Sequence, residues 1–102
     1  MAAININKEQ FEQFSNHDKP VLVDFWAPWC SYCKVIGAVL EQCAVSAPAE
    51  AVIAKVNVDD NTEVSAKYGI TTLPTLILFK DGVEISRHGM LKKAEILTLL
   101  DS

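Results

Sequence analysis

The chain has 102 residues, a length typical of one domain, and we expect a single domain over residues 1–102. Half of the residues are hydrophobic and 22% are charged, which supports a folded core and excludes a largely disordered chain. Thirteen acidic side chains against nine basic ones give a net charge of −4, so nucleic acid is not an expected partner.

The N-terminal segment has neither a basic start followed by a long apolar run nor a small-residue cleavage site. Apolar stretches elsewhere fall far short of the roughly 20 residues that a membrane-spanning helix needs. We therefore expect a protein of the reducing cytoplasm with no membrane partner. In that compartment a close pair of cysteines is more often redox-active or metal-binding than a structural disulfide.

The first half of the chain alternates helix and strand. Asn7 begins a capping pattern that predicts a short helix over about residues 8–16. Residues 21–26 are almost continuously apolar, as in a strand that is buried on both faces of a parallel sheet. Apolar residues then recur with helical period as far as Pro48, which predicts a second, longer helix directly after the strand.

The next segment repeats this order. Residues 51–58 predict another buried strand, and a short helix capped by Asn61 and closing at Gly69 follows it. Strands that alternate with helices in this way favour an α/β fold with parallel strands.

The last part of the chain predicts a hairpin and a helix. Residues 76–80 and 83–88 flank Asp81 and Gly82, a dipeptide preferred in two-residue hairpin turns. The last two strands should therefore be antiparallel. An apolar stripe over residues 91–100 predicts a final helix that covers the sheet.

The candidate chemistry lies at Cys30 and Cys33. Cys30 falls where the strand ends and the helix begins, so unpaired backbone N–H groups and the positive end of the helix dipole favour its thiolate form. Two intervening residues place Cys33 one turn further along, close enough to displace a mixed disulfide formed by Cys30. We expect an outward, nucleophilic Cys30 and a recessed, resolving Cys33. A closed zinc site needs four ligands, and only Cys43, His17 and His88 remain, none in a paired spacing, so redox chemistry is favoured over metal binding.

Asp24 interrupts the otherwise apolar strand over residues 21–26. A carboxylate buried without compensation carries a large desolvation cost, so its pKa should rise. Lys55, on the next predicted strand, is a candidate partner. The strand has no polar alternation, which favours a buried Asp24 over the alternative of a solvent-exposed residue at the strand end.

Residues 23–34, which read Val-Asp-Phe-Trp-Ala-Pro-Trp-Cys-Ser-Tyr-Cys-Lys, resemble the active-site segment of the thioredoxin family. Further segments agree with that family in order and spacing over nearly the whole chain, namely residues 52–59, 68–70, 73–76 and 79–82. The resemblance implies a thioredoxin fold, with a central mixed β-sheet flanked by helices. It also implies a monomeric thiol–disulfide oxidoreductase that reduces protein disulfides without a bound cofactor. Its electrons would come from thioredoxin reductase, an NADPH-dependent flavoprotein.

The resemblance also implies residue roles. Cys30 and Cys33 form the redox disulfide, and Asp24 exchanges a proton with Cys33 while Lys55 tunes that exchange. The bond before Pro74 is expected to be cis, although only about 5–6% of X–Pro bonds in folded proteins are. The implied substrate-binding residues surround the cysteine pair: Trp29, Ser31, Tyr32, Thr72, Leu73, Pro74 and Gly89.

Ser31 and Tyr32 depart from the Gly-Pro that the family usually carries between its cysteines. Ser31 can donate a hydrogen bond to a thiolate, which predicts a reduction potential less negative than that of the Gly-Pro form. Two alternatives remain open. Tyr32 before Cys33 is compatible with a glutaredoxin-like, glutathione-dependent reductase, and the chain could also be a binding module whose cysteines are incidental.

Overall fold

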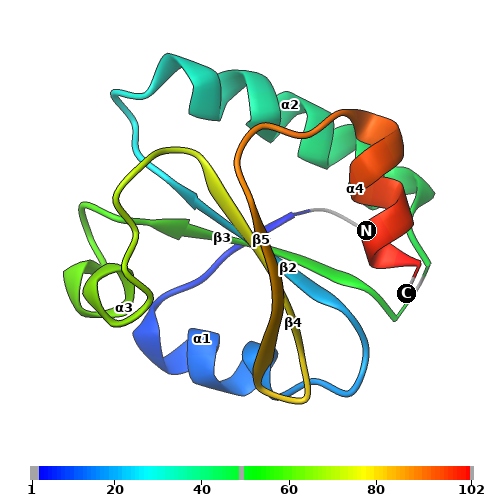
Figure 1. The fold of residues 1–102 in the computed structure, drawn as a ribbon, viewed down its shortest axis with the longest axis horizontal. Helices are drawn as coiled ribbons and strands as arrows, with labels where there is room; N and C mark the ends of the chain where they lie inside the picture. The colour runs from blue at the N-terminus through cyan, green and yellow to red at the C-terminus, as the bar shows by residue number, and fades with distance from the viewer. Residues whose placement is uncertain (1–2, 49, 102) are drawn as a thin grey trace.

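The structure is a computed structural model that describes residues 3–48 and 50–101. Figure 1 shows its helices and strands around one sheet. In chain order they are β1 (Ile4–Asn5), α1 (Lys8–Ser15), β2 (Val21–Trp26), α2 (Ser31–Ser46), β3 (Val52–Asn57), α3 (Thr62–Lys67), β4 (Thr75–Lys80), β5 (Val83–His88) and α4 (Lys93–Leu100).

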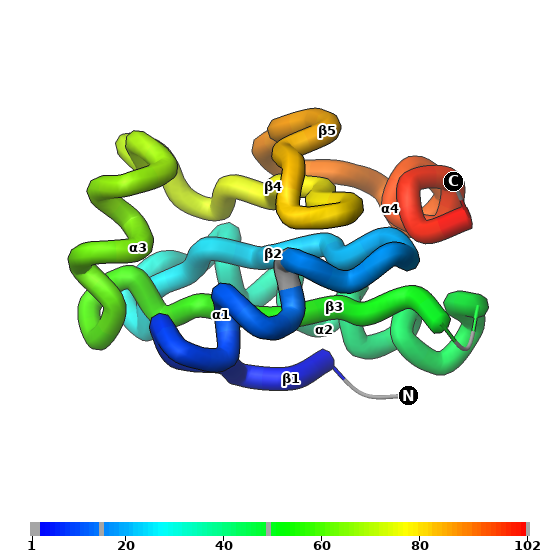
Figure 2. Tube along the Cα trace, turned by 90° about the horizontal axis from the view of Figure 1, so that it is seen from below, coloured from blue at the N-terminus to red at the C-terminus, as the bar shows by residue number. Residues whose placement is uncertain are grey.

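The five strands form one mixed sheet in the order β1-β3-β2-β4-β5. Strand β3 pairs in parallel with both β1 and β2, whereas β4 runs antiparallel to β2 and to β5. Helices α1 and α3 cover one face of the sheet, and α2 and α4 cover the other (Figures 1 and 2). The mixed sheet flanked by helices confirms the predicted fold class.

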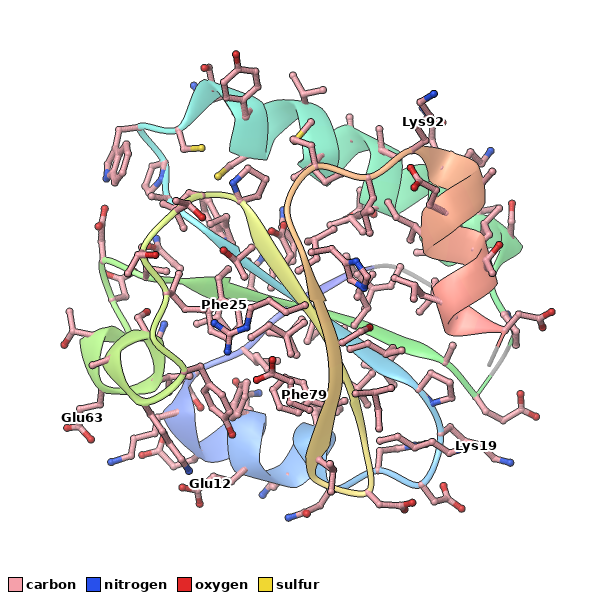
Figure 3. All side chains as sticks on the ribbon, in the orientation of Figure 1. Glu12, Lys19, Phe25, Glu63, Phe79 and Lys92 are labelled. Carbon is pink, nitrogen blue, oxygen red and sulfur yellow. The ribbon has the colours of Figure 1, made fainter. Side chains whose placement is uncertain are left out.

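The central strand β2 is buried from Val21 to Phe25 because helices cover both of its faces. Val21, Val23 and Phe25 pack toward α1, whereas Leu22 packs toward α2. Phe25 and Phe79 lie in an aromatic cluster on the α1 face, where a Phe11 ring meets Phe79 edge-on at a centroid distance of 5.4 Å (Figure 3). This two-sided burial explains the almost continuous apolar run in the sequence.

The predicted cap of α1 is confirmed, and the predicted cap of α3 is wrong. The Asn7 side chain accepts the Gln10 backbone N–H at 3.0 Å, and the Gln10 side chain accepts the Asn7 backbone N–H at 3.1 Å. Asn61 makes no such cap, because its amide Nδ2 instead donates to the Asn57 carbonyl oxygen at 2.9 Å. Gly69 follows α3 with a left-handed φ of 62°, as a helix-ending glycine often does.

The hairpin between β4 and β5 turns where the sequence predicts. Asp81 and Gly82 have φ values of 55° and 77°, the left-handed pair that a two-residue hairpin favours. One strand and one helix start differ from expectation by more than a residue. Strand β1 was not predicted, because two residues carry no readable alternation, and α4 begins at Lys93 rather than at Leu91.

Candidate active site

Cys30 is the cap residue of α2, directly after the short turn that leaves β2. Its extended backbone and its position before the first helical turn leave the Sγ facing the helix N–H groups. The backbone N–H of Cys33 donates a 3.2 Å hydrogen bond to Cys30 Sγ. Both thiols are free, and the two cysteines approach each other to within 2.5 Å. The spacing therefore brings the pair within reach of an internal disulfide, as the sequence predicts.

The expectation of an outward Cys30 is wrong, whereas Cys33 is recessed as expected. Cys30 is 7% exposed and Cys33 is 4% exposed, so both are buried. The reason is packing, since Ala27 shares a buried cluster with the two cysteines, and Leu73, from the loop before β4, packs against that cluster. Exposure alone does not distinguish the two thiols.

The electrostatic environments of the two sulfurs do distinguish them. Burial raises the pKa of the Cys33 thiol to about 12, and its contact with Cys30 and the negative charge of Asp24 act in the same direction. Cys33 is thus held in its protonated form. Cys30, in contrast, accepts a backbone N–H at a helix N-terminus, an arrangement that stabilises a negative sulfur.

Asp24 is fully buried, as predicted. Neither of its carboxylate oxygens accepts a hydrogen bond from the residues that the structure describes. Burial raises the pKa of Asp24 to about 7, and the positive charge of Lys55 opposes part of that rise. The strand therefore holds an ionisable group that changes charge near neutral pH and whose negative charge acts on Cys33.

Lys55 lies directly opposite Asp24 in the pairing of β2 with β3. Its ammonium nitrogen Nζ sits 5.2 Å from the centroid of the Trp26 ring, in a cation–π contact. The buried indole Nε1 of Trp26 has no hydrogen-bond partner among the described residues. Trp26 also packs against the cysteine cluster, so it contacts both parts of the site.

The loop before β4 closes the site from the other side. The Leu73–Pro74 bond is cis, as the family resemblance implies. Leu73 is half-buried against the cysteine cluster, and Pro74 is buried. Thr72 and Gly89 are exposed and line one pocket of about 220 Å³, which places these two predicted substrate-binding residues together.

The remaining predicted binding residues form the outer surface of the site. Ser31 is exposed, and Tyr32 and Trp29 are exposed apolar side chains at 65% and 70%. The Trp29 indole Nε1 donates a 3.0 Å hydrogen bond to Asp59 Oδ2. Sequence reasoning missed Asp59, because the contact joins residues thirty positions apart and no local pattern signals it. Ser31 makes no hydrogen bond to Cys30 Sγ in the part of the chain described, contrary to expectation.

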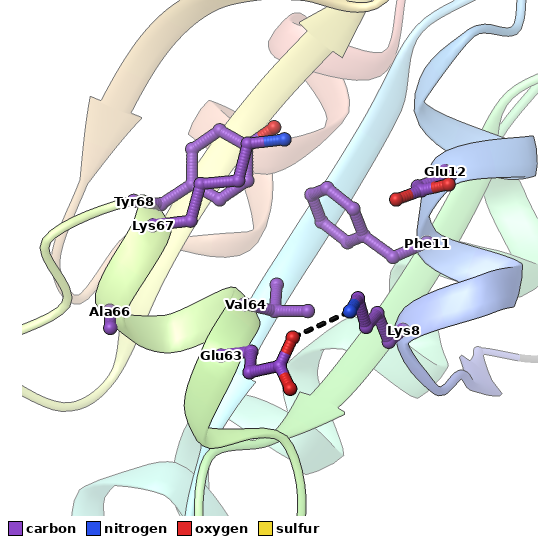
Figure 4. A pocket seen from close by; sticks show the side chains of 8 residues that line it. All are labelled: Lys8, Phe11, Glu12, Glu63, Val64, Ala66, Lys67 and Tyr68. Carbon is purple, nitrogen blue, oxygen red and sulfur yellow. Dashed lines mark hydrogen bonds and ion pairs between the residues drawn. The ribbon is translucent and has the colours of Figure 1, made fainter.

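Another pocket, of about 480 Å³, lies between α1 and α3, on the sheet face opposite α2 (Figure 4). Phe11, Val64 and Tyr68 line it, and Lys8 Nζ pairs with Glu63 at 2.5 Å on its rim. The sheet separates this pocket from the cysteines.

Within residues 3–48 and 50–101, no group of three or more histidine, cysteine or acidic side chains is arranged to hold a metal ion. The described helices are also too short or too polar to cross a membrane.

Comparison with known proteins identifies the family. A family model described as thioredoxin matches residues 2–102. The chain belongs to the thioredoxin family. It is 42% identical to a thioredoxin of Pseudomonas aeruginosa over 101 residues, which covers 97% of this chain and 94% of that protein. A thioredoxin of Haemophilus influenzae is 40% identical over 100 residues, covering 96% of this chain and 94% of the relative.

Solved thioredoxin structures share the fold. A mutant thioredoxin from Halobacterium salinarum superposes with a TM-score of 0.87 at 26% identity, over 98% of this chain and 88% of the other. A thioredoxin from Malassezia sympodialis gives a TM-score of 0.86 at 32% identity, over 98% and 89%. The cysteine pair and these relatives together make the chain a thiol–disulfide oxidoreductase that reduces protein disulfides. Thioredoxins act on protein disulfides, so protein disulfides are the substrates of this chain.

Proposed function

We propose that Cys30 is the attacking thiol of this reductase and that Cys33 resolves the intermediate. The observation that carries the assignment is the one-sided hydrogen bond, in which the Cys33 backbone N–H donates to Cys30 Sγ. That bond favours a negative sulfur at Cys30, while burial keeps the proton on Cys33. Two thiols with opposite preferences suit a sequence of attack followed by resolution.

The Cys30 thiolate attacks one sulfur of a substrate disulfide, forms a mixed disulfide and releases the other substrate sulfur as a thiolate. Cys33 then loses its proton and attacks Cys30 Sγ, which releases the second substrate thiolate. The two substrate sulfurs gain two electrons, and Cys30 and Cys33 become a disulfide. No cofactor takes part in these steps.

Asp24 receives the Cys33 proton in this proposal, and Lys55 tunes its basicity. A base is most effective when its pKa lies near the working pH, and the pKa of Asp24 is raised to about 7. The negative charge of Asp24 acts on the Cys33 thiol, which supports an exchange between them, through a water molecule where they do not touch.

We propose that an extended segment of the substrate lies along the exposed rim of the cysteine cluster. The backbone of Leu73, before the buried Pro74, pairs with that segment. The apolar rings on the rim and the polar residues of the neighbouring pocket supply further contacts, and together these binding residues are Trp29, Ser31, Tyr32, Thr72, Leu73, Pro74 and Gly89.

Trapping of the mixed disulfide tests the two roles. Cys33→Ser should accumulate a covalent complex with a disulfide-containing protein such as insulin, while Cys30→Ser should form none and should lose insulin reduction by dithiothreitol. Cys43→Ser is the matched control, because Cys43 is a buried free thiol on the same helix. Complex formation through Cys33 in the Cys30→Ser variant, with activity retained, would reverse the assignment.

We propose that thioredoxin reductase, an NADPH-dependent flavoprotein, returns the pair to its dithiol form, and that the protein works as a single-domain monomer over residues 1–102. A reducing cytoplasm fits this cycle, because the attacking form is the dithiol. NADPH oxidation in a mixture of reductase, this protein and insulin tests the electron donor. Turnover with glutathione alone, in the absence of reductase, would favour the glutaredoxin-like alternative instead.

A further inference from the structure

The ammonium group of Lys55 is not bonded to the carboxylate it faces. Lys55 and Asp24 are partners in register on the parallel strands β3 and β2, and neighbouring strands lie about 4.8 Å apart, well within the reach of a lysine. Even so, both Asp24 oxygens lack a hydrogen-bond donor among the described residues. A buried acid beside a lysine that could pair with it therefore remains without that pairing.

Trp26 explains where the ammonium group goes. On β2, Trp26 follows Asp24 by two residues and so lies on the same face of the strand, where Lys55 Nζ sits 5.2 Å from its ring centroid. Gly37 of α2 is also close to this ammonium group, since a Cβ there would lie 3.5 Å from Lys55 Nζ, an ordinary contact distance. The ammonium group thus lies near both the indole ring and α2.

We propose that Trp26 is a positioning residue, whose indole face draws the Lys55 ammonium group away from Asp24 and so leaves the Asp24 carboxylate a stronger base toward Cys33. The proposal rests on the proton exchange between Asp24 and Cys33 described above. The negative face of an indole ring is the best of the aromatic side chains for holding a cation. A direct ion pair would instead stabilise the ionised carboxylate and weaken it as a proton acceptor.

The surroundings of Asp24 leave Lys55 as the main adjustable charge. From α2, the ionisable group that faces it is Cys33, whose thiol feels the negative charge of Asp24, with Cys30 next to Cys33. From β4 the partner in register is Leu76, which carries no charge. Lys55 on β3 is the positive charge that opposes the raised pKa of Asp24. A change in the position of Lys55 should therefore appear directly in the titration of Asp24.

The titration of the Asp24 carboxyl carbon by ¹³C NMR tests the proposal in the disulfide form of the full chain, where neither active-site sulfur titrates. Trp26→Leu should lower the midpoint by one pH unit or more, because Lys55 then moves onto the carboxylate. Trp26→Phe keeps a ring with a weaker pull on cations and fills most of the same space, so it should lower the midpoint by less. It also provides a folded variant if Trp26→Leu does not fold.

Repeating both substitutions in a Lys55→Met background separates cation positioning from hydration. With Lys55 absent, the two Trp26 variants should share the Lys55→Met midpoint. The proposal is overturned if the Asp24 midpoint stays the same or rises in Trp26→Phe. It is also overturned if the Trp26 substitutions lower the midpoint equally with and without Lys55, since water entering the site would then be the cause.

The pH profile of mixed-disulfide resolution keeps this proposal distinct from the proposed role of Asp24. The pH at half-maximal resolution rate should move with the NMR midpoint. If the midpoint moves while the resolution profile does not, Trp26 positions Lys55 as proposed but Asp24 is not the proton acceptor.

Discussion

The backbone N–H of Cys33 points at Cys30 Sγ across the first turn of α2, at a distance of 3.2 Å. This contact makes the two sulfurs unequal although both are buried. One sulfur accepts a peptide donor at the positive end of a helix, and the other lies a turn deeper, where burial disfavours its charge. The proposed order of attack and resolution rests on this difference.

Replacing Ser31 and Tyr32 with Gly and Pro should make the reduction potential more negative. Proline at position 32 removes one of the backbone N–H groups that form the positive end of α2 beside Cys30, and the interaction of a charge with a helix end contributes about 0.3–1 kcal/mol. At 30 mV per ~1.4 kcal/mol this corresponds to roughly 6–20 mV. Equilibration with a glutathione couple measures the change. Ser31→Ala serves as the control and should leave the potential nearly unchanged, because the Ser31 hydroxyl does not bond to Cys30 Sγ among the described residues.

The stability of the protein should fall as pH rises through the range set by Asp24. The pKa of Asp24 rises from 3.8 to about 7 on folding, so the folded state holds a proton that the unfolded state releases. This penalty is absent below pH ~4, grows between pH ~4 and ~7, and is complete above pH ~7, where it reaches about 4 kcal/mol at roughly 1.4 kcal/mol per pKa unit.

Urea unfolding between pH 5 and 8 measures this effect, and Asp24→Asn should lose most of the pH dependence. Equal slopes for the two proteins over this range would show that Asp24 does not carry the effect.

Asp59→Ala should weaken substrate reduction without a large loss of stability. The substitution frees the Trp29 indole, which is 70% exposed and is held by the Asp59 hydrogen bond. Loss of one exposed hydrogen bond of about 1 kcal/mol predicts a decrease in kcat/KM of about fivefold, with a change in tryptophan fluorescence. Asp60→Ala removes the same charge one residue away and is the matched control. A similar decrease in Asp60→Ala would attribute the effect to net charge.

Gly82→Ala should destabilise the fold by about 1–3 kcal/mol, since Gly82 has a φ of 77°, which L side chains rarely adopt. A Cβ there would also lie 2.3 Å from Asn16 Oδ1, so the Asn16 side chain must move. Thermal unfolding measures the loss. Gly89→Ala is the comparison, because a Cβ at Gly89 meets no atom within 4 Å and stability should hardly change. Equal losses in the two variants would contradict this explanation.

Local patterns predicted most of the fold. The cap at Asn7, the strand over residues 21–26 and the turn at Asp81 depend on near neighbours, and the structure has all three. The cap at Asn61 is wrong because an asparagine side chain can bond either the helix N–H groups that follow it or a backbone carbonyl that precedes it. Residue propensity does not decide between these two, and the structure has the bond to the Asn57 carbonyl.

Side-chain contacts across the sheet were less accessible to sequence reasoning. The burial of Asp24 followed from the apolar strand around it, whereas the position of Lys55 over Trp26 depends on strand register. The burial of Cys30 depends on Leu73, more than forty residues away in the chain. Such contacts are set by tertiary packing, which no local period encodes.

The relative reactivity of the three thiols tests the central claim most directly. The reduced protein is treated with limiting iodoacetamide at neutral pH, and mass spectrometry of its peptides gives the alkylation rate at each cysteine. The account predicts that Cys30 is alkylated much faster than Cys33 and than Cys43, whose buried thiols have raised pKa values. Alkylation of Cys30 no faster than of Cys43 would contradict it.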